Sequence, residues 1–488
     1  MTFLWFIVRF FNGCVLALLM VQSLIYLAQL VIAYLELRQH HRSASRSDPW
    51  WMLTSGVALP ISILVPAHNE EETIVENVRS MLALHYPDFE VIVINDGSKD
   101  RTLAVLIEAL GLHKVERVWH ADVQHKEIRG LYGSPRYPRL LLVDKVNGGK
   151  SDALNAGINL SRFPLFCAVD ADSLLDHDSL LQVMRPFIEE PEEMVAVGGR
   201  ICIVNGCTVK SGQVVEIALP TQPLPLLQSV EYIRAFLIAR LAWSRLGAML
   251  IISGAFGLFK RSAAVQVGGY SHDTVGEDME IVVKLHRHFR EREQPYQMRF
   301  VANSVCWTQA PETLGILRRQ RSRWQRGMMQ SLAKHRGMIF NPKYGPVGTI
   351  GMGYFFLFDI IGPVVELAGL LLVPVSCYLG TVTPHFFLAW LALTFTYGVF
   401  LSASSLLLEM MVTRTTRPKD LALLMMSAVL ENFGYRQLNS FWRIEGIWQF
   451  LTGKQGWGAM QRTKFQKSMP EAGTPPPSHP PNPPQHRR

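Results

Sequence analysis

The chain has 488 residues, 49% of them hydrophobic and 18% charged, with a formal net charge of +8, so it has room for one large or two ordinary soluble domains plus several membrane spans. Its basic residues gather beside apolar segments, which indicates the cytoplasmic face of a membrane and argues against nucleic acid as a partner. The six cysteines show no C-x-x-C or Cys/His spacing, so we interpret them as reduced, packed thiols and not as metal ligands.

The N-terminal segment is expected to be an uncleaved membrane helix. Residues 12–35 carry no charge, are long enough to span a bilayer, and lack a clear small-residue cleavage site. The basic flank from Arg38 to Arg46 predicts that the following residues lie in the cytosol. We therefore assign residues 1–37 to a transmembrane helix and residues 38–60 to a basic linker.

From Ile61 to about Ala310, predicted strands and helices alternate, which is typical of an α/β domain with a largely parallel sheet. In such a sheet the ligand site lies beyond the carboxyl ends of the strands, so polar residues at those ends are the candidates for function. The expected elements are a strand at 62–66, a helix at 71–84, a strand at 90–95, a helix at 102–112, a strand at 140–143, a helix at 151–160 and a strand at 165–170.

The last of these strands is an apolar run that ends in two carboxylates, Asp170 and Asp172. The period of two along a strand predicts that both lie on the same side of its exit. Hard oxygen ligands at this place suit a divalent cation that carries a phosphorylated substrate. The alternative is that Asp172 caps the next helix, with Ser173 beside it.

The first two strands also end in polar clusters. The first is followed by Pro66, Asn69 and Glu70, and the second by Asp96 and Gly97. Successive clusters of this kind are expected in a nucleotide pocket in which Asp96 accepts a hydrogen bond from a base or ribose. Taken alone, each cluster could equally be a helix cap.

A Gly-Gly-Lys stretch opens the helix expected at residues 151–160. Gly148 and Gly149 would let the backbone approach an anion, and the Lys150 ammonium would neutralise it. The stretch is not a Walker A loop, because G-x-x-x-x-G-K-[ST] is absent. A simple turn is the alternative.

A pair of acids, Glu277 and Asp278, precedes a helix expected from Met279 to Arg290. Asp278 could be the N-cap of this helix. An acid about a hundred residues after the two-carboxylate strand is also available as a general base, and the sequence alone leaves both interpretations open.

A basic amphipathic helix is expected from Leu314 to Arg336, lying at an interface rather than crossing the membrane. The spacing i, i+3, i+4 puts Gln320, Arg323 and Trp324 on one face. There a cation can meet a diphosphate and an indole can stack on a sugar ring. The alternative is an ordinary interfacial helix with a tryptophan anchor.

Apolar segments follow at residues 345–360, 362–381, 385–411 and 420–438. The first pair could form one long span with an interfacial lead-in or a hairpin. The basic stretch from Lys454 to Lys467 favours a cytosolic tail, which requires two or four crossings. We assign residues 313–344 to interface helices, 345–453 to a membrane region, and 454–488 to a basic, proline-rich disordered tail.

In this order between membrane segments, the motifs resemble those of the processive membrane glycosyltransferases of family 2, which include synthases of cellulose, hyaluronan, chitin and poly-β-1,6-N-acetylglucosamine. The resemblance covers about residues 58–340, and residues 147–155 are most similar to the poly-N-acetylglucosamine and chitooligosaccharide branch. It implies a GT-A fold for residues 61–312. The motifs are Asp96-Gly97-Ser98, Asp170-Ala171-Asp172, Gly276-Glu277-Asp278 and Gln320-x-x-Arg323-Trp324.

The resemblance also implies roles for single residues. Asp96 would contact uridine, Asp170 would lie near the ribose and diphosphate, and Asp172 would bind Mg²⁺ or Mn²⁺. Asp278, next to Glu277, would deprotonate the acceptor hydroxyl. The acceptor end and the leaving diphosphate would be held by Gln320, Arg323 and Trp324, and the donor pocket completed by Pro66, Asn69, Glu70, Gly97 and Lys150.

We therefore expect an inverting, processive enzyme of the membrane that elongates a β-linked polysaccharide from a UDP-sugar, with UDP-N-acetylglucosamine as the best candidate. The alternatives are a non-processive transferase that adds one sugar to a lipid carrier or glycolipid, and a catalytically inactive subunit. The resemblance predicts a multi-pass protein with a cytosolic catalytic domain and a secretion or accessory subunit as a further partner. A Gly-Glu-Asp motif and the lack of room for a C-terminal regulatory β-barrel distinguish the chain from cellulose synthases.

Overall fold

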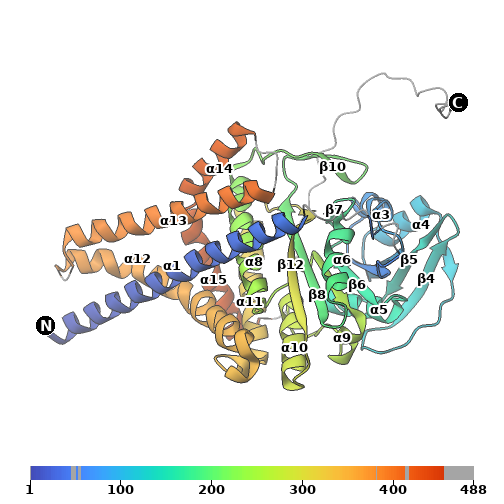
Figure 1. Cartoon of the computed structure of the whole chain (residues 1–488), viewed down its shortest axis with the longest axis horizontal. Helices are drawn as coiled ribbons and strands as arrows, with labels where there is room; N and C mark the ends of the chain where they lie inside the picture. Colours follow the sequence, from blue (N-terminus) through green and yellow to red (C-terminus); the bar gives the residue numbers. More distant parts are fainter. Residues whose placement is uncertain (1, 45–50, 53–55, 381, 413–416, 455–488) are drawn as a thin grey trace.

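The computed structural model describes residues 2–44, 51–52, 56–380, 382–412 and 417–454. Figure 1 shows a rounded α/β domain with a group of long helices that projects from one side of it. The predicted α/β architecture is therefore confirmed. The stretches 45–50 and 53–55 of the expected linker, and the expected tail after Lys454, lie outside the described residues.

The domain is built on a ten-stranded sheet with the order β3-β4-β5-β2-β1-β6-β11-β8-β12-β7. The four neighbours β5, β2, β1 and β6 are parallel, as predicted. The sheet is nevertheless mixed, because β11 runs antiparallel to both β6 and β8, and β4 runs antiparallel to β5. Its strands are β1 (Ile61–Ala67), β2 (Phe89–Asp96), β3 (His113–Val115), β4 (Ile128–Ser134), β5 (Tyr137–Lys145), β6 (Leu165–Val169), β7 (Leu174–Leu175), β8 (Met194–Ile203), β11 (Phe256–Lys260) and β12 (Gln297–Thr308); β9 (Thr208–Lys210) and β10 (Gln213–Glu216) pair separately.

Helices cover both faces of this sheet, and the four helices predicted within the domain are all present. The helix predicted to begin at Glu71 begins at Ile74, because backbone hydrogen bonds to the Glu70 carbonyl first close a turn. The next predicted helix ends at Gly111, whose φ of 59° is the left-handed conformation that glycine favours at a helix end. The domain helices are α3 (Ile74–Leu82), α4 (Thr102–Leu110), α5 (Lys150–Leu160), α6 (Ser179–Glu189), α7 (Pro223–Tyr232), α8 (Arg240–Arg245), α9 (Arg261–Gln266), α10 (Glu277–Glu291) and α11 (Leu314–Lys334), with a π-helical segment η1 (Ile233–Ala239) between α7 and α8.

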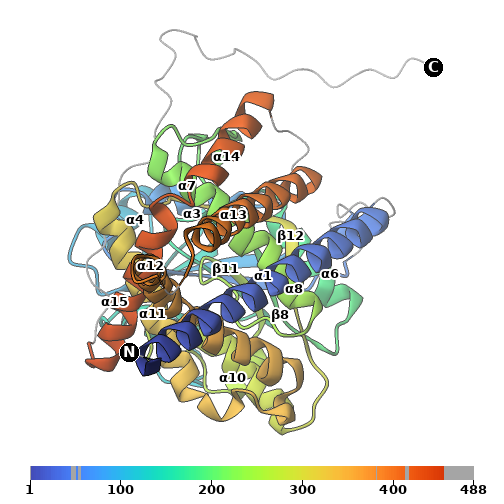
Figure 2. The ribbon, with the colours of Figure 1, turned by 90° about the vertical axis from the view of Figure 1, so that its left-hand side faces the viewer.

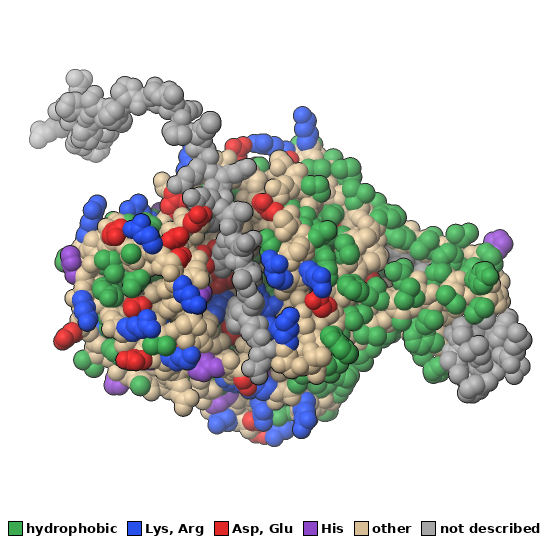
Figure 3. All heavy atoms as spheres, turned by 180° about the vertical axis from the view of Figure 1, so that it is seen from behind, with side chains coloured by type: hydrophobic (Ala, Val, Ile, Leu, Met, Phe, Trp, Pro, Cys, Tyr) green, Lys and Arg blue, Asp and Glu red, His purple; other side chains and the backbone are tan. Residues whose placement is uncertain are grey.

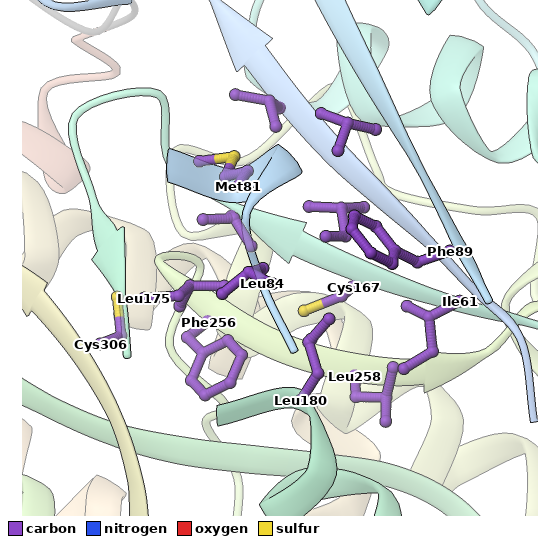
Figure 4. Packing of buried hydrophobic residues seen from close by; sticks show 14 of the residues in the cluster. Ile61, Met81, Leu84, Phe89, Cys167, Leu175, Leu180, Phe256, Leu258 and Cys306 are labelled. Carbon is purple, nitrogen blue, oxygen red and sulfur yellow. The ribbon is translucent and has the colours of Figure 1, made fainter. Parts of the chain in front are cut away.

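The core lies on the two faces of the sheet. Ile61, Ile63 and Val65 of β1 belong to one buried cluster and Leu64 to the other, as the alternation of side chains along a strand requires. Figure 4 shows Ile61, Cys167 and Leu258 packed together on the first face. The central strands are apolar throughout because both of their faces are covered.

Within the described residues, three helices are long and apolar enough to cross a membrane, which indicates a membrane protein: Phe10–Gln39, Val347–Tyr378 and Phe395–Val412. The first is part of α1 (Thr2–Ala44) and contains the predicted span at residues 12–35. Figure 2 shows α1, α12 and α13 extending together in front of the domain, and Figure 3 shows hydrophobic side chains gathered over the projecting part.

The C-terminal segments bear on the alternatives that the sequence left open. Residues 347–378 form one continuous helical segment and not a hairpin, because π-helical turns lead directly into α12, and this segment is one candidate span. The predicted segment at 420–438 is covered mainly by α14, whose 13 residues are too short to span a bilayer. Two candidate spans therefore follow the domain within the described residues. The elements are η2 (Arg336–Met338), η3 (Pro342–Tyr344), η4 (Val347–Met352), η5 (Phe355–Ile361), α12 (Gly362–Tyr378), α13 (Pro384–Val412), α14 (Pro418–Leu430) and α15 (Tyr435–Leu451).

A buried histidine predicts acid sensitivity of the domain. His286 of α10 lies 2.8 Å from both the Tyr296 hydroxyl and the Met249 carbonyl oxygen, and burial lowers its pKa to about 4. The unfolded chain binds this proton near pH 6.5, so stability should fall by about 1.4 kcal/mol per pH unit between pH 6.5 and 4. We expect the thermal midpoint of the purified protein to drop over this range and His286→Gln to flatten the drop. An equal slope in the variant would contradict this assignment.

Candidate active site

A cavity of about 1330 Å³ opens at the carboxyl ends of β1, β2 and β6. The predicted site residues line it except Gly97 and Gly148. Gly97 has a φ of +59°, and a Cβ at this position would lie 2.8 Å from the Asn147 backbone nitrogen. It therefore permits close contact between the loops after β2 and β5 and does not form part of the cavity wall.

Hydrogen bonds join the loop after β1 to the segment after β2. The Asn69 side chain accepts a hydrogen bond from the Lys99 backbone nitrogen at 2.8 Å, and the Glu70 backbone nitrogen donates to Thr102 Oγ1 at 2.8 Å. The two polar clusters predicted from the sequence thus form one continuous rim, to which Pro66 also contributes. They do not act as helix caps, because Thr73 and Arg101 occupy the N-cap positions of α3 and α4.

Asp96 organises the glycine loop. Its Oδ1 accepts from Lys145 Nζ at 2.7 Å and from the Gly148 backbone nitrogen at 2.9 Å, and its Oδ2 accepts from the Gly149 nitrogen at 2.7 Å. A carboxylate has about four acceptor sites. These three donors therefore leave one, on Oδ2, for a ligand.

The sequence interpretation missed Lys145, which is fully buried at the end of β5. Its ammonium forms ion pairs with Asp96 and Asp152. A buried lysine is stable only when such partners surround it. A lysine at the end of an apolar strand could have been recognised in the sequence. The sequence pattern does not, however, indicate which acidic residues pair with it.

Lys150, Asp170 and Glu277 form a charged cluster at the cavity floor. Lys150 Nζ lies 2.5 Å from Asp170 Oδ1 and 3.1 Å from Glu277 Oε1. Burial alone would lower the pKa of Lys150, but the two carboxylates raise it above its ordinary value. The predicted anion-binding lysine is therefore held at the site by acidic side chains contributed by two distant segments.

Asp172 does not cap a helix. The chain turns after it and enters the short strand β7, and the next helix, α6, begins at Ser179. Burial and the neighbouring Asp170 carboxylate raise the pKa of Asp172 to about 7. Adjacent carboxylates of this kind are stabilised by a cation.

No group of three or more His, Cys, Asp or Glu side chains in the described part of the chain forms a complete metal site. Asp170 and Asp172 nevertheless offer hard oxygen ligands at the cavity. Mg²⁺ in proteins is commonly bound by one or two carboxylates plus substrate phosphates. The two residues fit a cation of this type.

Asp278 lies in the first turn of α10, where Gly276 occupies the N-cap position. Its Oδ1 accepts from the Met279 backbone nitrogen at 2.8 Å and its Oδ2 from the Gly254 nitrogen at 3.4 Å. The N-cap interpretation of Asp278 is therefore wrong. The carboxylate lines the cavity beside the charged cluster.

Two glycines bring α11 against this acidic turn. A Cβ on Gly276 would lie 2.9 Å from the Gly327 backbone, and a Cβ on Gly327 would lie 2.7 Å from the backbone of Gly276. Any larger residue would therefore force the helix away. This contact gives a physical reason for the Gly-Glu-Asp form of the motif.

We expect Gly327→Ala to cost about 1–3 kcal/mol of stability through overpacking and to lower activity by displacing α11. Gly315→Ala on the same helix is the matched control, because a Cβ there has nothing within 4 Å. The thermal midpoint and the initial rate of both variants are the measurements. Equal behaviour of the two would contradict the contact.

The predicted face of α11 does line the cavity. Gln320, Arg323 and Trp324 are all wall residues, and the Trp324 side chain is 38% exposed. The Arg321 guanidinium lies 4.5 Å from the centre of the Trp324 ring and 2.9 Å from the Glu231 carboxylate. Arg321 and Glu231 thus orient the indole, a role that no sequence pattern indicated.

The cavity continues from the sheet toward the projecting helices. Its lining there is largely polar, and comes from α1, η5, α12, α13 and α15. Arg443 of α15 pairs with Asp359 at 2.6 Å, and Ser440 donates to Glu366 at 2.7 Å. The residues of this part include Gln22, Tyr26, Gln29, Asp359, Glu366, Asn439, Ser440 and Arg443.

The sequence profile of glycosyl transferase family 2 matches residues 62–264, and that of glycosyl transferase family group 2 matches residues 165–429, which is more than half of the chain. The chain belongs to glycosyl transferase family 2. This family 2 glycosyltransferase is 31% identical over 267 residues to a poly-beta-1,6-N-acetyl-D-glucosamine synthase of Staphylococcus epidermidis, in an alignment that covers 55% of this chain and 54% of the relative.

A protein of the same name from Staphylococcus aureus strain COL is 30% identical over the same length, with the same coverage of both chains. The family 2 chain thus spans about half the length of the curated relatives it matches. Among solved structures, a mannosyltransferase from Pyrobaculum calidifontis in complex with GDP-Man and Mn²⁺ aligns with a TM-score of 0.50 and 18% identity, covering 91% of this chain and 100% of that one. The predicted GT-A fold is confirmed.

Proposed function

We propose that this glycosyltransferase is an inverting, processive enzyme that elongates a β-linked polysaccharide from a UDP-sugar, with UDP-N-acetylglucosamine as the donor. The observation that carries the proposal is the single cavity that joins the strand ends to the membrane helices. A polymer that grows at Asp278 would have a polar path toward the bilayer. The similarity to poly-N-acetylglucosamine synthases over half of the chain supports this sugar.

The proposal divides the chain into a membrane helix at 1–37, a transferase domain at 61–312 and interface helices at 313–344. The linker at 38–60, the membrane region at 345–453 and the tail at 454–488 complete it. The basic residues from Arg38 to Arg46 support a cytosolic catalytic domain, because cytoplasmic flanks are enriched in lysine and arginine. A secretion or accessory subunit would receive the polymer on the far side of the membrane.

In the proposed reaction, the acceptor hydroxyl oxygen forms a bond to the anomeric carbon of the donor while the bond from this carbon to UDP breaks. Asp278 takes the hydroxyl proton, and attack from the face opposite UDP inverts an α-linked donor to a β-linked product. Asp96 would use its remaining acceptor site for uridine. Arg323 would stabilise the charge that develops on the diphosphate.

Asp172 would hold Mg²⁺ or Mn²⁺, with Asp170 next to it near the ribose and diphosphate. The cation, when bound, would neutralise charge on the leaving diphosphate. Lys150 and Glu277 would keep Asp170 in position through the ion pairs already described. Pro66, Asn69 and Glu70 would close the donor side of the pocket. Gly97 permits the close approach of the loops after β2 and β5 there.

The test is to purify the protein in nanodiscs with Mg²⁺ or Mn²⁺ and to offer each radiolabelled UDP-sugar alone and the glucuronate/N-acetylglucosamine pair together. A ladder or high-mass product from UDP-N-acetylglucosamine alone is the expected result. A product that needs the pair would indicate hyaluronan, and a single addition to lipid would indicate the non-processive alternative. UDP binding without turnover would indicate an inactive subunit or a missing partner.

We expect Trp324→Ala to reduce polymer elongation by about 30-fold, the effect of truncating a tryptophan that carries about 2 kcal/mol of binding. Hydrolysis of the donor should fall much less, because the indole would bind the acceptor and not UDP. Product length and free sugar release are measured in parallel. Equal losses in both would argue against an acceptor platform at Trp324.

A further inference from the structure

A second cavity, of about 970 Å³, lies at the opposite edge of the sheet. It includes Glu90 near the start of β2, whereas the active-site cavity includes Asp96 at the end of the same strand. Six residues along a strand separate these positions by about 20 Å. The two cavities share no lining residue, and Figure 1 shows β4 and β5 on the side of the domain away from α12 and α13.

The lining of this second cavity is strongly basic, with four arginines and one carboxylate, Glu90. Arg162 and Arg117 both pair with Glu90, at 3.0 and 3.4 Å, so that one carboxylate serves two guanidinium groups. Burial lowers the pKa of Arg117 and the nearby Arg162 lowers it further, although Glu90 acts in the opposite direction. A bound anion would relieve this crowding.

With the other two arginines, Arg139 and Arg261, the positive charges of the cavity lining outnumber its negative charges. Arg261 pairs with Asp122 at 2.7 Å. Arg139 donates to the Pro87 carbonyl at 3.1 Å and lies 4.8 Å from the centre of the Phe89 ring, and it has no ion pair within the described part of the chain. Arg139 is therefore available to a ligand.

An aromatic surface completes the cavity. Trp119 lies in its wall and is 37% exposed, next to Val118, which is 96% exposed. An exposed indole of this kind is a stacking surface for a flat ring. The segment that supplies it connects β3 and β4 and contains none of the family 2 motifs.

We propose that this cavity binds a nucleotide, with its phosphates on the arginines and its base on Trp119. A guanidinium group can donate two parallel hydrogen bonds to phosphate oxygens. The cavity volume is at the upper end of the range for small-molecule sites. The distance from the projecting helices argues against a lipid headgroup. The positive charge of the lining would repel the free amino groups of an amino-sugar polymer, which argues against such a ligand. The proposal does not depend on the proposed transferase activity.

The test measures binding of ATP, in EDTA, to the purified full chain by calorimetry. A purine nucleotide is used without metal so that it does not bind at the active site, where uridine and a cation are expected. We expect Arg139→Gln and Trp119→Ala each to weaken ATP binding by about 10-fold or more. Arg136→Gln on the turn between β4 and β5 should leave ATP binding unchanged, because Arg136 is exposed and does not line the cavity.

Adenosine, which lacks phosphates, should bind at least about 10-fold more weakly than ATP if the arginines recognise the anion. Absence of ATP binding to the parent protein, equal binding by parent and variants, or equal affinity for adenosine and ATP would each overturn the proposal. Arg139 and Trp119 are both exposed, so their variants should fold, and an unchanged thermal midpoint verifies this.

Discussion

Replacing Asp278 by asparagine is expected to lower sugar transfer by roughly 10²- to 10⁴-fold, the range for loss of a general base. The substitution keeps the shape of the side chain. Oδ1 can still accept from the Met279 backbone nitrogen, and only the 3.4 Å contact from Gly254 to Oδ2 is lost. The affinity for UDP should therefore stay within about 2-fold, because the proton acceptor and not the donor pocket is removed.

Initial rates with labelled donor and calorimetric UDP binding test this expectation together. Asp273→Asn is the control, because Asp273 is an exposed acid on the preceding loop that pairs with Lys334. Unchanged turnover in the Asp278 variant would refute its assignment as the base. Parallel loss of UDP binding would instead indicate that Asp278 maintains the structure of the donor pocket.

The central strands and their helices could be predicted because their signals are local. β1, β2 and β6 are short apolar runs, and each is followed by polar residues. The prediction did not extend to β8, β11 or β12, where polar residues and glycines interrupt the pattern. Gly199 of β8 illustrates the reason, because a Cβ there would lie 2.2 Å from the Phe256 ring of β11. Such a requirement exists only between strands distant in the sequence.

The candidate site shows the same division. The sequence indicated which side chains would gather at the strand ends, but not how they would pair. Lys150 was expected to neutralise an anion, yet it also contacts Glu277, which lies more than a hundred residues later. Lys145 and Glu231 escaped notice because their roles depend entirely on partners brought together by the fold.

The structure also resolved local alternatives that spacing could not. Asp172 and Asp278 each had a helix-cap interpretation, which is the commonest explanation of an acid before a helix. The chain after Asp172 enters β7 because Leu174 and Leu175 pair with β12. Pairing with β12 therefore places a strand, and not a helix, shortly after Asp172.

Asp172→Asn is expected to reduce sugar transfer by about 10³-fold or more, because a cation at a leaving diphosphate contributes several kcal/mol. Asparagine keeps the size of the side chain but removes the negative charge that would attract the cation. Treatment with EDTA should abolish transfer by the parent protein, and added Mn²⁺ should restore it. The variant should remain inactive after the same addition.

Binding of Mn²⁺ in the presence of UDP separates this role from a structural one. The parent protein should bind the ion with UDP, and Asp172→Asn should bind it at least about 10-fold more weakly, as expected for loss of a charged ligand. Asp178→Asn is the matched control, because Asp178 is the N-cap of α6, where asparagine serves equally well. If the Asp172 variant bound Mn²⁺ normally but failed in transfer, the carboxylate would act on the substrate directly. If it bound and transferred normally, the cation would have to be held elsewhere, and the raised pKa of Asp172 would reflect only burial beside Asp170.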